Sequence, residues 1–94
     1  MDLKDIQDLM LRLYGKRDKE RGIEGTFVWL VEEIGELSKA IRKKDSEGIK
    51  EEMADVLAWL FSLANVLGID LAKCFLEKYS ICPRCKNIPC ICPM

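Results

Sequence analysis

The sequence contains no histidine, and all three of its prolines lie beyond residue 82. Any zinc site must therefore be built from cysteine, and the proline-containing end cannot be helical. The formal net charge of -1 argues against broad electrostatic attraction to nucleic acid or to an anionic membrane. No apolar run reaches membrane-spanning length, because the longest, residues 56–67, is interrupted by Ser62 and Asn65. No stretch alternates as a β-strand does.

The chain has 94 residues, 49% of them hydrophobic and 33% charged, which is typical of a single globular domain. Such a short chain buries a modest fraction of its surface, so we expect oligomerisation or a bound metal to stabilise it. The N-terminal MDLKDIQDLM lacks the basic start and apolar core of a signal peptide, which favours a cytoplasmic protein. Four of the five cysteines lie at or beyond residue 82, and such a cytosolic cluster more often binds metal than forms disulfides.

Helical periodicity predicts an all-α fold. Apolar residues recur at helical spacing over residues 2–16, 26–44, 46–67 and 70–79. The charged connector GKRDKERGIEG reads as a loop or a frayed helix end. Thr26 is the expected N-cap of the second segment, and Gly68 is the expected C-cap of the third. The short break at Asp45 makes these two segments a helical hairpin, in a bundle of about four helices completed by oligomerisation.

Two pairs of acidic residues interrupt the apolar pattern of this hairpin. They are Glu33 and Glu36 in the first helix and Glu52 and Asp55 in the second. The i, i+3 spacing places the two carboxylates of each pair on one side of a helical turn. Each pair also shares its face with a tryptophan, Trp29 or Trp59. A purely solvated face does not normally carry tryptophan, so we expect a ligand, a partner subunit or both to cover these faces.

A different face of each helix is aliphatic, and we expect it to form the core. Its members are Leu30, Val31, Ile34, Leu37 and Ile41, then Ile49, Met53, Val56, Leu57, Leu60, Ala64 and Leu67. Four carboxylates converging on the other faces would repel one another unless a cation compensated them, and Mg²⁺ prefers such oxygen ligands. The alternative is a solvated surface on which Lys39 and Lys43 pair with neighbouring glutamates.

The motifs Glu33-Ile-Gly-Glu36 and Glu52-Met-Ala-Asp55 resemble the E-x-x-E and E-x-x-D signature of the MazG-like nucleoside triphosphate pyrophosphohydrolases, an all-α family. The resemblance covers roughly residues 10 to 80 and implies a catalytic domain over residues 1–80. It implies that the four acids bind Mg²⁺ and that the chain forms a tight dimer or a dimer of dimers. The implied reaction, a nucleotide-pool sanitation step, converts a nucleoside triphosphate to a monophosphate and pyrophosphate, with Mg²⁺ neutralising the phosphates.

Several residues are candidates for substrate binding. Trp59 and Trp29 lie one turn from the acids and could stack on a base, although both could equally pack in a helix interface. Lys78 falls where relatives carry a phosphate-contacting lysine, but the asparagine that often follows four residues later is a cysteine here. Lys16, Arg17 and Arg21 in the connector are further candidates for phosphate contact, although charged connectors are usually only solvated.

The C-terminal CPRCKNIPCICPM contains a C-x-x-C pair and a C-x-C pair, formed by Cys82, Cys85, Cys90 and Cys92. Four thiolates satisfy tetrahedral Zn²⁺, so we expect a zinc knuckle over residues 81–94. An iron–sulfur cluster takes the same ligands, and a tail without metal or with disulfides is the remaining alternative. If the helices were only an oligomeric scaffold, this knuckle would be a non-enzymatic module binding protein or nucleic acid. The near-neutral charge and the few aromatic and basic residues weigh against nucleic acid.

Overall fold

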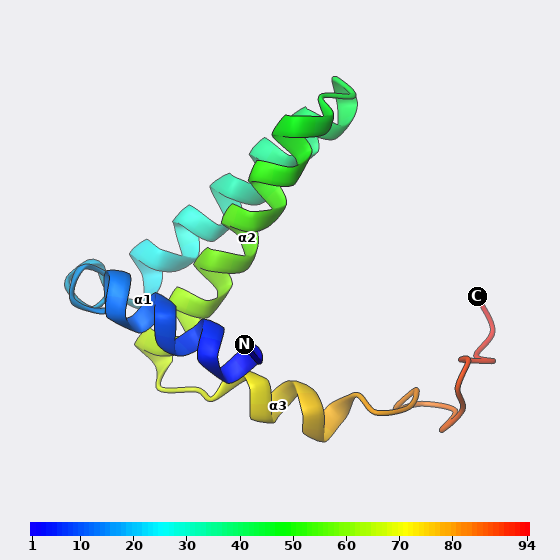
Figure 1. Cartoon of the computed structure of the whole chain (residues 1–94). Helices are drawn as coiled ribbons and strands as arrows, with labels where there is room; N and C mark the ends of the chain where they lie inside the picture. The colour runs from blue at the N-terminus through cyan, green and yellow to red at the C-terminus, as the bar shows by residue number, and fades with distance from the viewer.

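The computed structural model describes all 94 residues and is helical up to a C-terminal tail (Figure 1). Helix α1 spans Leu3–Arg42, α2 spans Ser46–Leu67 and α3 spans Leu71–Lys78, and there is no β-strand. The all-α fold, the hairpin and the non-helical tail are therefore confirmed. The chain has three helices rather than about four, and it does not form a four-helix bundle by itself.

Helix α1 is broken at Gly22, whose φ of 84° and ψ of 177° are not helical. Only glycine adopts this conformation readily. The break directs the N-terminal half of α1 across the end of the hairpin (Figure 1). The predicted loop over residues 15–25 is therefore wrong, because its lysines, arginines and glutamates are good helix formers and only Gly22 interrupts them. The predicted N-cap is also wrong, since Thr26 is buried inside the helix.

The ends of α2 and α3 follow the capping signals in the sequence. The Asp45 carboxylate accepts a hydrogen bond from the Gly48 N–H at 3.1 Å and caps α2. Gly68 ends that helix in the left-handed conformation, with φ 69°. The Asp70 carboxylate accepts from the Lys73 N–H at 3.1 Å and caps α3. These local bonds fix where both helices begin.

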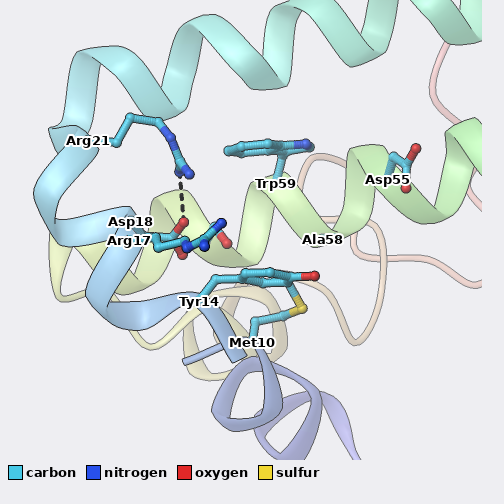
Figure 2. Close-up of a pocket in the computed structure, with 9 residues that line it drawn as sticks. Met10, Tyr14, Arg17, Asp18, Arg21, Asp55, Ala58 and Trp59 are labelled. Carbon is cyan, nitrogen blue, oxygen red and sulfur yellow. Dashed lines mark hydrogen bonds and ion pairs between the residues drawn. The ribbon is translucent and has the colours of Figure 1, made fainter. Parts of the chain in front are cut away.

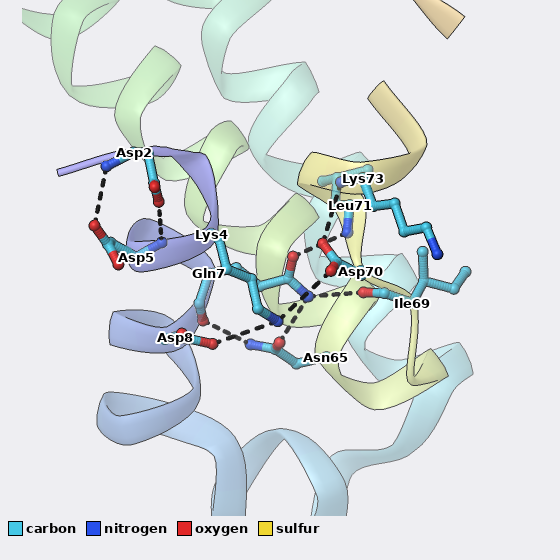
Figure 3. Close-up of polar contacts among 10 residues, drawn as sticks. All are labelled: Asp2, Lys4, Asp5, Gln7, Asp8, Asn65, Ile69, Asp70, Leu71 and Lys73. Carbon is cyan, nitrogen blue, oxygen red and sulfur yellow. Dashed lines mark hydrogen bonds and ion pairs between the residues drawn. The ribbon is translucent and has the colours of Figure 1, made fainter. Parts of the chain in front are cut away.

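The side chain of Gln7 forms hydrogen bonds that join the start of α1 to the turn between α2 and α3 (Figure 3). We call these hydrogen bonds the Gln7 clamp. The Gln7 amide nitrogen donates to Asn65 Oδ1 at 2.9 Å and to the Ile69 carbonyl at 2.7 Å. The Gln7 amide oxygen accepts from the Leu71 N–H at 3.0 Å. Gln7 is buried and its side chain is fully engaged, so the clamp holds the N-terminal half of α1 against α2.

The faces that carry the acids, rather than the aliphatic faces, are the better buried ones in the hairpin. Ala40 and Ser62, which share the acidic faces, are buried. Most residues predicted to form the core are exposed, namely Val31, Ile34, Ile41, Met53, Leu57, Leu60 and Leu67. That prediction is therefore wrong for most of the set. Of the predicted set only Leu30 and Ala64 are buried, while the half-exposed Trp29 stacks on Trp59 between the helices.

Membrane-spanning length and apolar character do not occur together in any single helix. Helices α2 and α3 reach both only as a pair, and that pair is bent by 104°.

Candidate functional site

Three acidic side chains meet between α1 and α2. Glu33 comes from α1, while Glu52 and Asp55 come from one turn of α2, and one carboxylate oxygen of each lies within 4.8 Å of the other two. The i, i+3 spacing puts Glu52 and Asp55 on the same side of α2, and the hairpin brings Glu33 opposite them. The structure thus brings together three of the four acids singled out in the sequence. We call these three residues the acidic cluster.

The carboxylates of the acidic cluster lie close enough to one another to shift a pKa. Partial burial, a hydrogen bond with Glu52 and the negative charges of Glu52, Asp55 and Glu36 raise the pKa of Glu33 from its ordinary 4.5 to about 7. Glu52 Oε2 is buried and has no hydrogen-bond partner. Such an orphaned oxygen is unfavourable, and a cation would supply its missing partner. A donor set made only of carboxylates suits a hard ion such as Mg²⁺.

Glu36 lies further along α1 and is exposed. Its oxygens are not among those that converge, although its charge helps to raise the pKa of Glu33. It lines a shallow hollow together with Lys39, Lys43 and Glu52. No ion pair joins Glu36 to either lysine, and its exposure agrees with the solvated surface that was the alternative for this residue.

The two tryptophans stack on each other across the hairpin. Their ring centroids are 5.6 Å apart and their planes differ by 9°. The Arg21 guanidinium carbon lies 4.7 Å from the centroid of the Trp59 ring, which is a cation–π geometry. Trp29 and Trp59 therefore do pack in the helix interface. Trp59, unlike Trp29, also lines the pocket that contains Asp55.

That pocket, about 250 Å³ in volume, opens between the N-terminal half of α1 and α2 (Figure 2). It is lined by Met10, Tyr14, Arg17, Asp18, Arg21, Asp55, Ala58, Trp59 and Ser62. In Figure 2 the rings of Tyr14 and Trp59 lie on opposite sides of the space, with the arginines toward one end and Asp55 toward the other. Two flat rings across a gap suit a planar aromatic ligand. Asp55 belongs to both the pocket and the acidic cluster, so one molecule could reach both.

A buried ion pair shapes the far end of the pocket. Arg21 Nη1 donates to Asp18 Oδ1 at 2.8 Å, and Asp18 is only 1% exposed. Sequence reasoning missed Tyr14 and Asp18 as pocket residues. The signal was present, because residues 14, 18 and 21 lie on one face of a helix. Reading the connector as a loop concealed that spacing.

Lys78 lies apart from the other predicted substrate-binding residues. It ends α3, and its ammonium group lies 5.5 Å from the centroid of the Tyr79 ring. It lines neither the pocket nor the acidic cluster.

The four cysteines of the tail converge. Cys82 Sγ lies 3.6 Å from Cys92 Sγ, and Cys85 Sγ lies 4.0 Å from Cys90 Sγ. All four sulfurs lie within 4.8 Å of one another. They are free thiols, since a disulfide holds its sulfurs about 2.05 Å apart. The Ile91 N–H donates to Cys85 Sγ at 3.4 Å, and the Cys92 N–H donates to Cys90 Sγ at 3.3 Å.

Backbone donors and neighbouring thiols shift the acidities of this group in opposite directions. The hydrogen bond from the Ile91 N–H is the main reason that the pKa of Cys85 falls to about 6. Backbone hydrogen bonds from Cys85 and then Arg84 lower the pKa of Cys82. The neighbouring thiols, Cys90 first, raise the pKa of Cys92 to about 11. In such a close group, the negative charge of one thiolate makes it harder to deprotonate the neighbouring thiols.

A family model described as the MazG nucleotide pyrophosphohydrolase domain matches residues 21–87, most of the chain. The matched region contains the acidic cluster, Glu36 and both tryptophans. It begins at the break in α1, so most of the pocket wall on that helix lies before it. It ends before the last two cysteines of the tail. Among the curated proteins, none matches this chain.

Proposed function

Because the chain belongs to the MazG nucleotide pyrophosphohydrolase domain family, we propose that it hydrolyses a nucleoside or deoxynucleoside triphosphate to the monophosphate and pyrophosphate, with Mg²⁺ as cofactor. The observation that carries this proposal is the position of Asp55, which lines the aromatic pocket and is also part of the acidic cluster. A nucleotide with its base in the pocket would have its phosphates beside the acids.

Glu33, Glu52 and Asp55 would hold the Mg²⁺, and Glu36 on the adjoining turn would complete the set. Mg²⁺ bound there supplies positive charge to the phosphates and lowers the pKa of a water molecule. The cluster takes its ligands from two helices, so its geometry depends on a closed hairpin. The orphaned oxygen of Glu52 supports this assignment.

The rings of Trp59 and Tyr14 would hold the base between them, since stacking on an aromatic side chain is worth about 1–3 kcal/mol per base. Trp29 would act behind Trp59, by fixing the plane of its ring. Arg21, restrained by its buried partner Asp18, keeps nitrogen donors at the far end of the pocket. Lys78 is proposed as a phosphate contact on the family resemblance alone.

We further propose a dimer or a dimer of dimers. The exposed aliphatic faces of both hairpin helices form a surface that a single chain leaves uncovered. Contiguous apolar surface of this kind marks protein interfaces. Light scattering coupled to gel filtration should give at least twice the mass of one chain. A particle of one chain mass would contradict this part of the proposal.

The catalytic domain would comprise residues 1–80 and would act in the cytoplasm on the nucleotide pool. Mg²⁺ is the cofactor of the reaction itself. The zinc expected at the tail cysteines belongs to residues 81–94 and has no part in the hydrolysis.

The test is pyrophosphate release from a panel of standard and modified nucleoside triphosphates, with and without Mg²⁺. Release by the wild type should fall more than about 100-fold in Glu52→Gln and in Asp55→Asn, beyond the 10–100-fold typical of residues that only orient a metal ligand. The matched control is Glu47→Gln, a glutamate of α2 whose side chain is 81% exposed, and it should release pyrophosphate as the wild type does. Pyrophosphate release by Glu36→Ala should also fall if Glu36 is the fourth Mg²⁺ ligand.

Absence of release from every nucleotide, by a folded oligomer, would contradict the enzymatic assignment. It would favour instead the non-enzymatic module in which the cysteine tail binds a partner. In that case the four tail cysteines, and not the acids of the hairpin, would be required for activity.

A further inference from the structure

The sulfur atoms of the tail have the spacing of a single tetrahedral metal site. Four sulfurs at about 2.3 Å from one zinc ion lie about 3.8 Å from one another. Here the Cys82–Cys92 and Cys85–Cys90 sulfur pairs are separated by 3.6 and 4.0 Å, and no pair among the four exceeds 4.8 Å. A multi-iron cluster distributes the four cysteines over two or four iron atoms, so the sulfurs bound to different irons lie further apart than those around a single ion. The tail geometry therefore fits one ion.

The loop that presents these sulfurs is built around the first pair. The Lys86 N–H donates to the Cys82 carbonyl at 2.8 Å, and the Cys82 N–H donates to the Asn87 carbonyl at 3.1 Å. The Asn87 side-chain amide donates to the Cys85 carbonyl at 2.7 Å. Lys86 has a φ of 62°, so the chain reverses directly after the second cysteine. This tight turn aims both thiols of the pair to the same side.

Nothing else in the tail could act as its core. Ile88 and Ile91 are 73% and 71% exposed, so the aliphatic side chains are not buried. No hydrogen bond or ion pair joins residues 81–94 to a helix. Figure 1 shows the tail extending away from the hairpin. A segment that buries so little apolar surface does not overcome its conformational entropy without a further link.

We propose that Cys82, Cys85, Cys90 and Cys92 bind one Zn²⁺ ion, and that this ion folds the C-terminal tail as a unit separate from the hydrolytic site. Four protein ligands leave no open position for a substrate, so the site is structural. The thiolate-only ligand set separates it chemically from the acidic cluster, which offers only oxygen. The family match ends at residue 87, so it includes the first cysteine pair but not the second.

The test is elemental analysis of the purified full-length chain, together with Co²⁺ substitution followed by absorption spectroscopy. The wild type should carry about one zinc per chain, and its Co²⁺ form should show thiolate charge-transfer bands and tetrahedral d–d bands. Cys85→Ser and Cys90→Ser, taken from the two pairs, should each lose the ion. Cys74→Ser is the matched control, because Cys74 is a free, exposed cysteine of α3 outside the cluster, and it should retain the ion.

Circular dichroism of each variant should show the helical content of the wild type, because the helices do not depend on the ion. Three results would overturn the proposal. The first is iron in place of zinc in the wild type. The second is a metal-free wild type in which a thiol count reveals disulfides. The third is fully reduced protein that takes up no Zn²⁺ in a direct titration.

Discussion

Trp29 and Trp59 lie face to face across the hairpin, with their ring centroids 5.6 Å apart. Each follows or precedes an acid of the cluster by one helical turn, since Trp29 comes four residues before Glu33 and Trp59 four residues after Asp55. The same rotation of the two helices that stacks the rings also brings the carboxylates together. The aromatic contact and the acidic cluster are therefore products of one packing arrangement.

The position of Trp59 in the pocket predicts that its ring contributes to nucleotide binding. Trp59→Ala should lower kcat/KM by about 10–100-fold, chiefly through KM, because stacking on a base is worth about 1–3 kcal/mol. Trp59→Phe should recover much of this loss. The measurement is steady-state pyrophosphate release against nucleotide concentration. Phe75→Ala, an exposed aromatic residue of α3, is the control and should leave KM unchanged. An unchanged KM in Trp59→Ala would remove Trp59 from the substrate site.

The raised pKa of Glu33 predicts a pH dependence of stability in the absence of metal. The folded protein holds this proton more tightly than the unfolded chain does. The resulting stabilisation is complete below about pH 4.5 and is lost as the pH rises through about 7. With a metal chelator present, the melting temperature should be measured at pH 5 and at pH 8. The fall between these two values should be larger for the wild type than for Glu33→Gln.

Saturating Mg²⁺ should reverse this loss at pH 8, because a ligand that binds only the folded state stabilises it. Glu33→Gln should respond less to Mg²⁺ than the wild type does. The melting temperatures of the two proteins could instead change equally with pH, both with and without Mg²⁺. That result would show that the neighbouring acids do not raise the pKa of Glu33.

The break at Gly22 predicts opposite outcomes for two glycine-to-alanine changes. Gly22 has a φ of 84°, so Gly22→Ala should destabilise the fold by about 1–3 kcal/mol although there is open space around the added methyl group. Gly35 lies in a regular helical part of α1 with no atom near the new methyl group. Gly35→Ala should stabilise the fold by up to about 1 kcal/mol. Chemical denaturation of both variants is the measurement, and a stabilising Gly22→Ala would contradict the strained conformation.

The Gln7 clamp predicts a larger stability loss than the ion pairs beside it. Gln7→Ala leaves the Leu71 N–H and the Ile69 carbonyl without their partner, and should lower the free energy of unfolding by about 2–4 kcal/mol. Lys4→Ala removes only surface contacts with Asp8 and Asp70 and should cost about 0–1 kcal/mol. Equal losses in urea unfolding of the two variants would show that the clamp adds nothing to stability.

Local signals in the sequence located the helix ends well. Asp45, Gly68 and Asp70 act on the backbone within a few residues, so their effects are readable without the tertiary structure. The spacing of the acids on α2 is local in the same sense, and Glu52 and Asp55 do lie together.

What the sequence could not settle depends on contacts between distant residues. Two faces of each hairpin helix carry apolar side chains, and periodicity alone does not say which face meets the other helix. The Trp29–Trp59 contact and the small residues beside it decide that question in favour of the acidic faces. The charged connector is helical on both sides of Gly22, and the turn signal of its glycines concealed this, since only Gly22 departs from helical geometry.

The interruption at Gly22 also separates the helical phases of the two halves of α1. A residue gained or lost before Gly22 would rotate the side chains on its N-terminal side by about 100° relative to the pocket. It would leave the orientation of Glu33 unchanged, because no continuous helix transmits the rotation. The family match begins at residue 21, beside this same interruption. The half of α1 that lines the pocket can therefore change in length without disturbing the half that carries Glu33.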